Sequence, residues 1–421
     1  MGSAITMRNA EQTGMISSEN TSVFKNRNFL FLFTGAFFSA PGYYVYLIGV
    51  EWLMLSITGN RSLFGFLFLA ASVPRLLFMT TGGIIADRFN KRTILFLSDL
   101  SRACLVGVIL ILVMNNQIAP WHLITFAALF GVSDAFSHPA VNSLTSTILE
   151  GEQLQKGNAL IQMTNQISPI LGPLAGGSFI YLVGFKGVFM LAGAMLLLSS
   201  LTVFQIRVNK TKERLNNIGA WSEFKEGIAY VRNHNFLASV MVMALFLNFF
   251  VTGPLSIGIP LMVKDVFHAD ALGLTTLEVS LGGGALFGSI LLASIGAIKK
   301  PGYLMLASIT LFGGLYAISG LGIGLYINAG LFLCIGFLLQ FVNVPLITMV
   351  QQTTDQAMIG RVLSLLMTVS TGLVPISYLV TSSLIAAGIS IQFITITGGL
   401  VVAVIALLYF KNQKILSFSY E

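Results

Sequence analysis

The sequence predicts an all-α membrane protein whose twelve transmembrane helices form two six-helix bundles, and three observations lead to this prediction. Of the 421 residues, 55% are hydrophobic and only 9% are charged, so a soluble globule would lack the polar surface to cover its core. Apolar stretches long enough to cross about 30 Å of hydrocarbon, which takes about 20 helical residues, recur along the chain. One long polar segment, residues 207–235, divides them six and six.

The predicted spans follow one another with short polar connections. Their approximate bounds are 29–56, 62–86, 93–114, 121–148, 153–182, 187–206, 236–263, 272–298, 302–324, 328–351, 361–387 and 390–411. We therefore expect five parts: a cytoplasmic N-terminal segment (1–28), a first bundle (29–206), a linker (207–235), a second bundle (236–411) and a cytoplasmic tail (412–421). The N-terminal segment lacks the apolar core of a signal peptide.

The distribution of lysine and arginine predicts the orientation in the membrane. With the N-terminus inside, 18 of the 23 basic residues lie in cytoplasmic segments, and only Arg61, Lys186 and Lys264 lie outside. Cytoplasmic loops carry such an excess of positive charge, so both termini are expected in the cytoplasm. This asymmetry and anionic lipid account for the net charge of +7, which therefore gives no reason to expect a nucleic-acid partner.

The linker is expected to contact the membrane surface. Its latter part, WSEFKEGIAYVRNHN, places Trp221, Phe224, Ile228 and Val231 at helical spacing with charged residues between them. This pattern predicts an amphipathic helix that lies on the inner face of the membrane.

The two halves resemble each other weakly. PAVNSLTSTILEGEQLQKGNALIQ in the first half and PLITMVQQTTDQAMIGRVLSLL in the second both contain a proline, a polar turn and a glycine that opens a new helix. Such repetition is typical of transporters built from related bundles.

A charged turn joins the second and third predicted spans. It reads Gly83-Ile-Ile-Ala-Asp87-Arg88-Phe-Asn-Lys91-Arg92, and we expect its asparagine, Asn90, to adopt the left-handed conformation that tight turns often need. The pattern resembles the signature Gly-x-x-x-Asp-Arg-x-Gly-Arg-Arg of the major facilitator superfamily.

The resemblance extends along nearly the whole chain. WLMLSITGN, VPRLLFMTTGGIIADRFNKR, LSDLSRA, SDAFSHPAVNSL, GNALIQMTNQISPILGPLAGG, FKEGIAYVRNHN and QQTTDQAMIGRVLSL are similar to the branch with the macrolide-efflux proteins and the enterobactin exporter. It implies two bundles related by a pseudo-twofold axis and an alternating-access transporter rather than an enzyme.

In that superfamily the aspartate of the turn, here Asp87, faces the N-terminus of the helix that begins near Gly360 and Arg361. A carboxylate at a helix N-terminus is stabilised by about 0.3–1 kcal/mol, so this contact would act as a conformational latch that exists only while the halves meet on the inside. Alternatively, the basic cluster only enforces topology, which we expect of Lys91 and Arg92 in either case.

Three charged residues lie within predicted spans. Arg75 in the second span and Asp99 and Arg102 in the third are at comparable depth at 1.5 Å per residue. An unpaired arginine in mid-membrane is costly, so these residues are expected to pair. The network is either a structural ion cluster or a direct participant in coupling.

Asp134, His138 and Asn142 project from one face of the fourth span, one helical turn apart. An acid and a histidine so placed are able to hold and pass a proton. Alternatively, Asp134 completes the arginine cluster and His138 bonds a backbone carbonyl.

Two glutamates, Glu51 and Glu278, lie toward the outer ends of the first and eighth spans. The exporter branch usually has Gly-Asp where this chain has Gly42-Tyr43, so the usual acid of the first span is absent. Glu51 either replaces that acid in proton coupling or extends to the lipid headgroups, and the same alternatives hold for Glu278.

The fifth span carries a motif similar to the antiporter signature of the superfamily, although Ala159 and Ser168 replace two of its upstream glycines. Its small residues allow close helix approach and its prolines allow bending. The motif consists of Pro169, Gly172, Pro173, Gly176 and Gly177.

Intramembrane polar groups usually face the protein interior, and aromatic and amide residues on several spans suit a bulky amphipathic cargo. The candidate cavity residues are Ser39, Tyr43, Tyr46, Asn142, Gln162, Gln166, Asn248, Phe249, Gln340 and Asn343.

The sequence lacks a Walker loop, so ATP is not expected to drive the protein. We expect no cofactor, no metal site among the four scattered histidines, and no disulfide between Cys104 and Cys334.

These observations predict a monomeric secondary exporter of the bacterial cytoplasmic membrane, in contact with membrane lipid. It would release drug-like or siderophore-like amphipathic molecules in exchange for protons. Two alternatives remain: a lipid or lysolipid flippase on the same fold, and a transport-inactive membrane receptor or scaffold that works through its linker.

Overall fold

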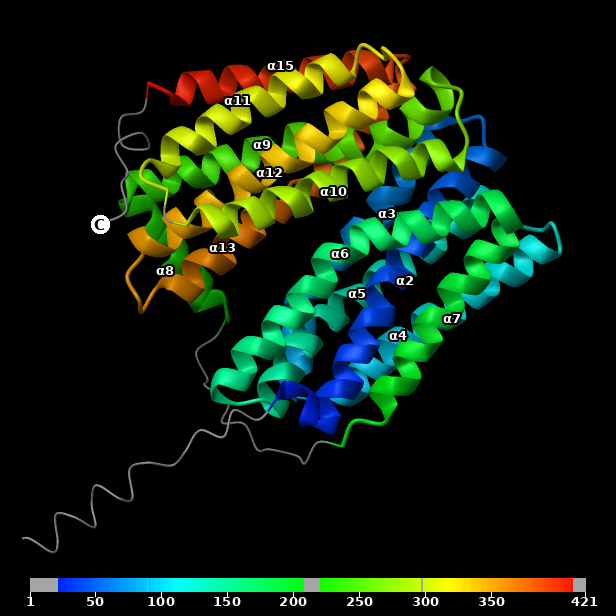
Figure 1. Ribbon diagram of the computed structural model, residues 1–421, viewed down its shortest axis with the longest axis horizontal. Helices are drawn as coiled ribbons and strands as arrows, with labels where there is room; N and C mark the ends of the chain where they lie inside the picture. Colours follow the sequence, from blue (N-terminus) through cyan, green and yellow to red (C-terminus); the bar gives the residue numbers. More distant parts are fainter. Residues whose placement is uncertain (1–21, 89, 208–219, 297, 412–421) are drawn as a thin grey trace, which may run out of the picture.

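The structure, a computed structural model, describes residues 22–88, 90–207, 220–296 and 298–411, and its ordered elements within these ranges are helices (Figure 1). The first half contains η1 (Val23–Lys25), α2 (Arg27–Ile57), α3 (Arg61–Arg88), α4 (Lys91–Met114), α5 (Pro120–Ile148), α6 (Gly151–Val183) and α7 (Phe185–Phe204). The second half contains α8 (Ala220–Asn233), α9 (Asn235–Leu261), the π-helical η2 (Met262–Val266), α10 (Ala271–Ile295), α11 (Pro301–Ser319), α12 (Leu325–Thr353), α13 (Ile359–Gly372), α14 (Val374–Ala386) and α15 (Ile391–Tyr409).

The all-α prediction is confirmed, and each predicted span has a helical counterpart. Within the described residues, eleven helices are long and apolar enough to cross a membrane, with α13 and α14 together counted as one. The helix α5 occupies the place of the predicted span 121–148 and has 29 residues, but it is not among the eleven. The count of twelve spans therefore stays a prediction.

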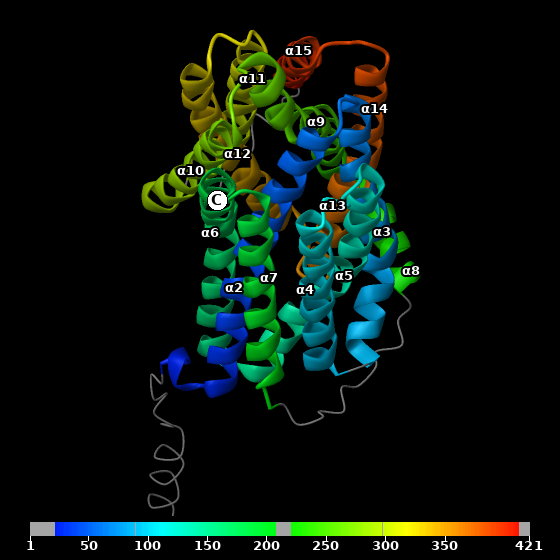
Figure 2. The same cartoon turned by 90° about the vertical axis from the view of Figure 1, so that its right-hand side faces the viewer.

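The helices of the two halves contact one another in the same pattern. α2 packs on α6 and α7 as α9 packs on α14 and α15; α3 packs on α5 as α10 packs on α12; and α4 packs on α7 as α11 packs on α15. Such a correspondence is what two repeats related by a pseudo-twofold axis produce. Figures 1 and 2 show the first bundle in blue to green and the second in green to red.

Two local features differ from the sequence-based expectations. The prediction of a left-handed Asn90 is wrong: its φ is −64°, and its side-chain oxygen accepts a hydrogen bond from the Arg92 N–H at 3.1 Å, which caps the first turn of α4. The predicted span 361–387 consists of two helices that meet at Leu373, because Pro375 in the first turn of α14 has no N–H for a continuous helix.

The two bundles meet at one end, which we call the closed end. There α6 contacts α10 and α3 contacts α14, the Arg61 guanidinium pairs with Asp265 at 2.7 Å, and the Lys264 ammonium donates to the Leu55 carbonyl. Figure 1 shows the bundles close together at this end and apart at the end that carries α8 and α13.

Close helix packing within the second bundle depends on glycine. A side chain at Gly284 of α10 would overlap the Leu333 carbonyl of α12, and one at Gly336 of α12 would overlap the Leu281 carbonyl of α10. In a bilayer, where lipid removes the hydrophobic driving force between helices, this close backbone approach is a main source of association.

We expect Gly284→Ala to lower the free energy of unfolding by about 1–3 kcal/mol, because the added methyl group must push α10 and α12 apart. The matched control is Gly283→Ala, since an added methyl group at Gly283 meets no atom within 4 Å. Thermal unfolding of the two purified variants in detergent measures the difference. Equal midpoints for the two variants would contradict this account of the α10–α12 contact.

Candidate functional site

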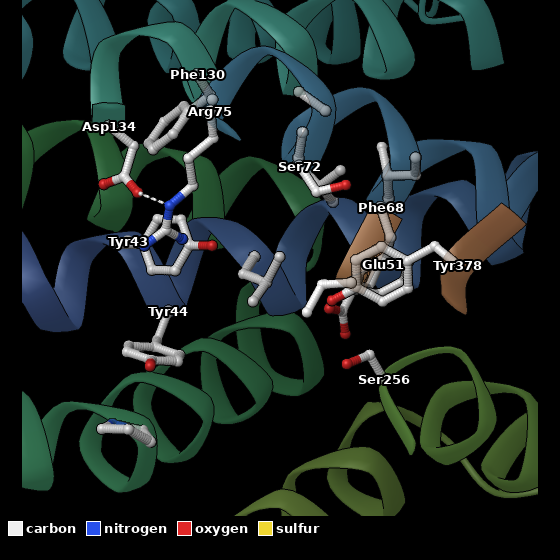
Figure 3. Close-up of a pocket in the computed structure, with 18 of the residues that line it drawn as sticks. Tyr43, Tyr44, Glu51, Phe68, Ser72, Arg75, Phe130, Asp134, Ser256 and Tyr378 are labelled. Carbon is white, nitrogen blue, oxygen red and sulfur yellow. Dashed lines mark ion pairs between the residues drawn. The ribbon is translucent and has the colours of Figure 1, made fainter. Parts of the chain in front are cut away.

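A cavity of about 640 Å³ lies between the two bundles (Figure 3). Its walls come from α2, α3, α5 and α6 of the first bundle and from α9, α10, α13 and α14 of the second. Aromatic side chains form much of the lining, namely Tyr43, Tyr44, Tyr46, Phe68, Phe130 and Tyr378. This size and this apolar lining suit a drug-sized organic molecule.

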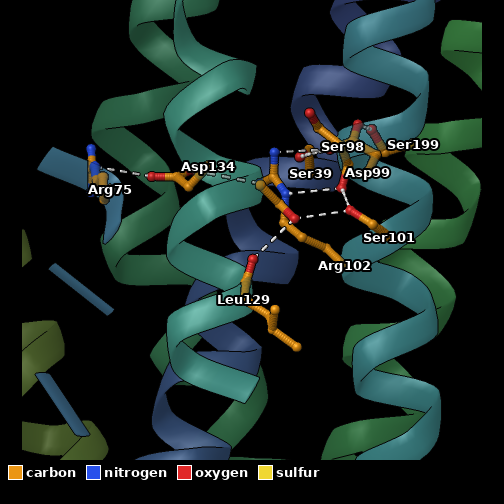
Figure 4. A network of polar contacts seen from close by, with 10 residues as sticks. Ser39, Arg75, Ser98, Asp99, Ser101, Arg102, Leu129, Asp134 and Ser199 are labelled. Atoms are coloured by element: carbon orange, nitrogen blue, oxygen red, sulfur yellow. Dashed lines mark hydrogen bonds and ion pairs between the residues drawn. The ribbon is translucent and has the colours of Figure 1, made fainter. Parts of the chain in front are cut away.

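A chain of ion pairs extends from the cavity wall into the first bundle (Figure 4). Arg75 on α3 pairs with Asp134 on α5 at 3.2 Å. Arg102 on α4 pairs with the same Asp134 at 3.7 Å and with Asp99, one turn back on α4, at 3.3 Å. Two arginines therefore balance two aspartates across three helices.

The buried part of this network is also well supplied with hydrogen bonds. The Asp99 carboxylate accepts one from the Ser39 hydroxyl of α2 at 3.0 Å and one from the Ser199 hydroxyl of α7 at 2.5 Å. The Arg102 Nε atom donates to the Ser98 carbonyl at 3.3 Å. Buried charges survive only when paired and bonded in this way, so the network joins five helices of the first bundle.

Two further carboxylates line the cavity from opposite bundles, Glu51 on α2 and Glu278 on α10. Glu51 is 3% exposed, and within the described part of the chain its Oε2 atom has no hydrogen-bond partner. Figure 3 places Glu51 beside Tyr378 and Ser256, at a distance from the Arg75–Asp134 pair. The cavity therefore has an end with paired charges and an end where Glu51 has no cationic partner among the described ion pairs.

The predicted cavity residues are only partly brought together. Tyr43 and Tyr46 line the cavity, and Tyr46 stacks on Phe130 with ring centroids 4.2 Å apart. Ser39 is instead bonded to Asp99. Outside the cavity lining lie Asn142, Gln162, Gln166, Asn248, Phe249, Gln340 and Asn343.

Sequence reasoning missed Tyr44, Phe68, Ser256 and Tyr378 as cavity residues. The available signal was the rule that polar aromatic groups within a span face the protein interior. Applied to Tyr378, that rule would have found a residue of the second bundle that lies next to Glu51 (Figure 3).

The expected latch is only partly visible. Gly83, Asp87 and Arg88 lie in α3, but their side chains are outside what the structure describes, as is the side chain of His138 in α5. The N-terminal turn of α13 contacts the linker helix α8, and its Arg361 pairs there with Glu226 at 2.8 Å.

The other residues of the expected latch are Lys91, Arg92 and Gly360, and the described hydrogen bonds and ion pairs do not join them to one another. The Lys91 ammonium donates to the Thr147 hydroxyl at 3.4 Å, and the Arg92 guanidinium donates to the Phe204 carbonyl and lies over the Phe204 ring. These contacts hold α4 to α5 and α7. A side chain at Gly360 would meet no atom within 4 Å.

The antiporter-like motif of α6 faces two neighbours. Gly172 and Gly176 pack against α2 within the first bundle, where an added methyl group would overlap Tyr44 or Ile48. Gly177 faces Thr275 of α10 in the other bundle. The prolines of the motif, Pro169 and Pro173, line the cavity.

Two pseudo-symmetric helical bundles around a central cavity, with charged groups inside the membrane-spanning region, are the architecture of a membrane transporter. A family model described as Major Facilitator Superfamily matches residues 32–378, and the chain belongs to this superfamily. The predicted resemblance is confirmed, and the protein is a transporter and not an enzyme.

The chain is 25% identical over 355 residues to macrolide efflux protein A of Streptococcus pyogenes. This alignment covers 83% of this chain and 87% of that protein. The chain is 20% identical over 396 residues to the staphyloferrin A transporter of Staphylococcus aureus, and this alignment covers 91% of this chain and 96% of that protein. Among solved structures, the nucleoside transporter NupG superimposes with a TM-score of 0.71 at 13% identity, over 91% of this chain and 100% of that chain. The structural likeness shows the fold.

Proposed function

We propose that this protein is a secondary exporter that moves bulky amphipathic small molecules out of the cell in exchange for protons. The observation that supports this most is the cavity between the bundles, which combines an aromatic lining with carboxylates from both bundles. The names of macrolide efflux protein A and the staphyloferrin A transporter support an organic cargo, and the first of these names also supports export.

The orientation is part of the proposal. We place the protein in the bacterial cytoplasmic membrane with both termini in the cytoplasm, because the basic residues gather on that side. The closed end is then the outer end, and the cavity opens toward the cytoplasm. The linker 207–235 would join the bundles 29–206 and 236–411 on the inner side, and the protein would act as a monomer.

Proton coupling requires an acid that exchanges its proton during the cycle. Asp134 is already paired with two arginines, which favours its role as part of the ion network. Glu51 and Glu278 have no cationic partner among the described ion pairs, so we assign proton exchange to them. Entry of one proton across 100 mV supplies about 2.3 kcal/mol for the conformational change.

Proteoliposomes with an imposed pH gradient test the proposal. We expect at least one fluorescent dye from a panel of cationic, neutral and anionic amphipathic compounds to move with the gradient, and this movement to disappear when the gradient is collapsed. The double substitution Glu51→Gln with Glu278→Gln should abolish the gradient dependence, whereas Glu152→Gln, whose side chain is 79% exposed on α6, should leave it intact. Movement that persists unchanged without a gradient would refute proton exchange and favour a flippase.

A further inference from the structure

The acids at the closed end of the cavity allow an inference about the charge of the cargo, and this inference rests on the function proposed above. Glu51 is buried in the cavity wall with one carboxylate oxygen that accepts no hydrogen bond from the described residues. A buried acceptor without a donor is costly. A positive charge placed beside this oxygen is therefore strongly stabilised.

The arginines of the site do not supply that charge. Arg75 is directed to Asp134 at 3.2 Å, and Arg102 is shared between Asp134 and Asp99. Figure 3 shows the Arg75–Asp134 pair at one end of the cavity and Glu51 at the other. With those four charges balanced, Glu51 and Glu278 are the acids left over.

The two acids face the same cavity from opposite bundles, Glu51 from α2 and Glu278 from α10. Two carboxylates in one cavity of low dielectric repel each other when both are charged. Either a proton or a cation between them relieves this repulsion. Both ligands would therefore compete for the same pair of carboxylates.

The surroundings of Glu51 favour an organic cation over a metal ion. Tyr378 lies beside Glu51, and the centroid of its ring is 5.3 Å from the centroid of the Phe68 ring. Aromatic faces attract ammonium and other organic cations. The cavity volume of about 640 Å³ leaves room for bulky apolar groups around the charge.

We propose that Glu51 and Glu278 together bind the positive charge of a bulky organic cation, which takes the place of a proton at the same carboxylates. A polyanionic cargo is excluded from this position by the same charges. Both acids lie about one helical turn from contacts of the closed end, since Leu55 accepts from Lys264 and Thr275 donates to the Pro173 carbonyl. A cation held between them therefore stabilises the state in which this end is closed.

Other titratable groups share the cavity and could contribute to its pH dependence. They are Tyr43, Tyr44 and Tyr46 on α2, Arg75 on α3, Asp134 on α5 and Tyr378 on α14. Of these, Arg75 and Asp134 are paired with each other, and the tyrosines are neutral at ordinary pH. The two glutamates are therefore the groups whose protonation should govern cation binding.

Equilibrium binding to the purified full-length protein tests this proposal without any pH gradient. The probes are tetraphenylphosphonium, a bulky organic cation, and tetraphenylborate, an anion of the same size and shape. We expect the cation to bind and the anion not to bind. Glu51→Gln and Glu278→Gln should each weaken cation binding about tenfold or more, with Glu152→Gln as the exposed control. Cation binding to the wild-type protein should weaken as the pH is lowered, and this pH dependence should flatten in both glutamine variants.

Each other outcome has a definite meaning. Equal binding of the anion, or glutamine variants that bind the cation like the wild-type protein, would overturn the proposal. Gradient-driven movement of neutral dyes by a protein that does not bind the cation would refute the cation site and leave the exporter intact. Cation binding without any gradient-driven transport would refute the proposed function and leave the site intact. Glu51→Asp, which keeps the charge, should retain cation binding and separates loss of charge from loss of folding.

Discussion

Replacement of Arg102 by methionine is expected to lower the free energy of unfolding by about 3–5 kcal/mol. Methionine keeps most of the apolar length of the side chain but removes the charge that faces Asp99 at 3.3 Å and Asp134 at 3.7 Å. Asp99, which is 1% exposed, would then be a buried carboxylate whose hydrogen-bond donors among the described residues are the two serine hydroxyls. Thermal unfolding in detergent and the yield of folded protein measure the loss.

A second substitution distinguishes lost charge balance from lost packing. Adding Asp99→Asn to Arg102→Met removes the uncompensated negative charge, while the amide oxygen still accepts a hydrogen bond from a serine hydroxyl. We therefore expect the double variant to recover a large part of the stability.

The surface pair between Lys156 and Glu152 provides the control for the Arg102 substitution. These side chains are 3.9 Å apart and mostly exposed, so Glu152→Gln should change stability by less than about 1 kcal/mol. A double variant less stable than Arg102→Met alone would contradict the ion-pair account.

The fold was predictable from the sequence because the bilayer restricts the possible structures. Each apolar run of about 20 residues must satisfy its backbone within a helix, and the position of the polar linker predicted a division of these runs into two halves. What the pattern did not reveal was local: Pro375 divides one span into α13 and α14, and Asn90 caps α4 instead of turning the chain. Both depend on the backbone geometry at single residues.

The charged part of the site was more predictable than the cavity lining. Arg75, Asp99 and Arg102 were expected to pair because they lie at comparable depth, and the joining of Asp134 to them was one of two alternatives. The four residues form one network. The lining depends on helix rotation and on which bundle faces which. This is why Gln162 on α6 is bonded to its neighbour Asn165 and does not reach the cavity, whereas Tyr378 does.

The closed end should open when glycines at the contact between the bundles are replaced. At Gly177 an added methyl group would overlap the Thr275 hydroxyl, and at Gly65 of α3 it would overlap Ser382 of α14. Each of these contacts is between a helix of the first bundle and a helix of the second. Because the bundles touch there only when this end is closed, the steric cost falls on the closed state alone. A cost of about 1–3 kcal/mol borne by one state shifts the ratio of the two states about 5–150-fold. We therefore expect Gly177→Ala and Gly65→Ala to favour a cavity open at the opposite end.

Side-specific labelling of a cavity cysteine measures this shift. Ser72→Cys on the cavity wall, in a protein with Cys104→Ser and Cys334→Ser, reports which side of the membrane reaches the cavity. A membrane-impermeant maleimide added at the closed end should react faster in the glycine variants. Gly107→Ala is the control, because an added methyl group at Gly107 meets no atom within 4 Å. Labelling in Gly177→Ala and Gly65→Ala that is as slow as in the Gly107→Ala control would show that these contacts between the bundles do not control closure.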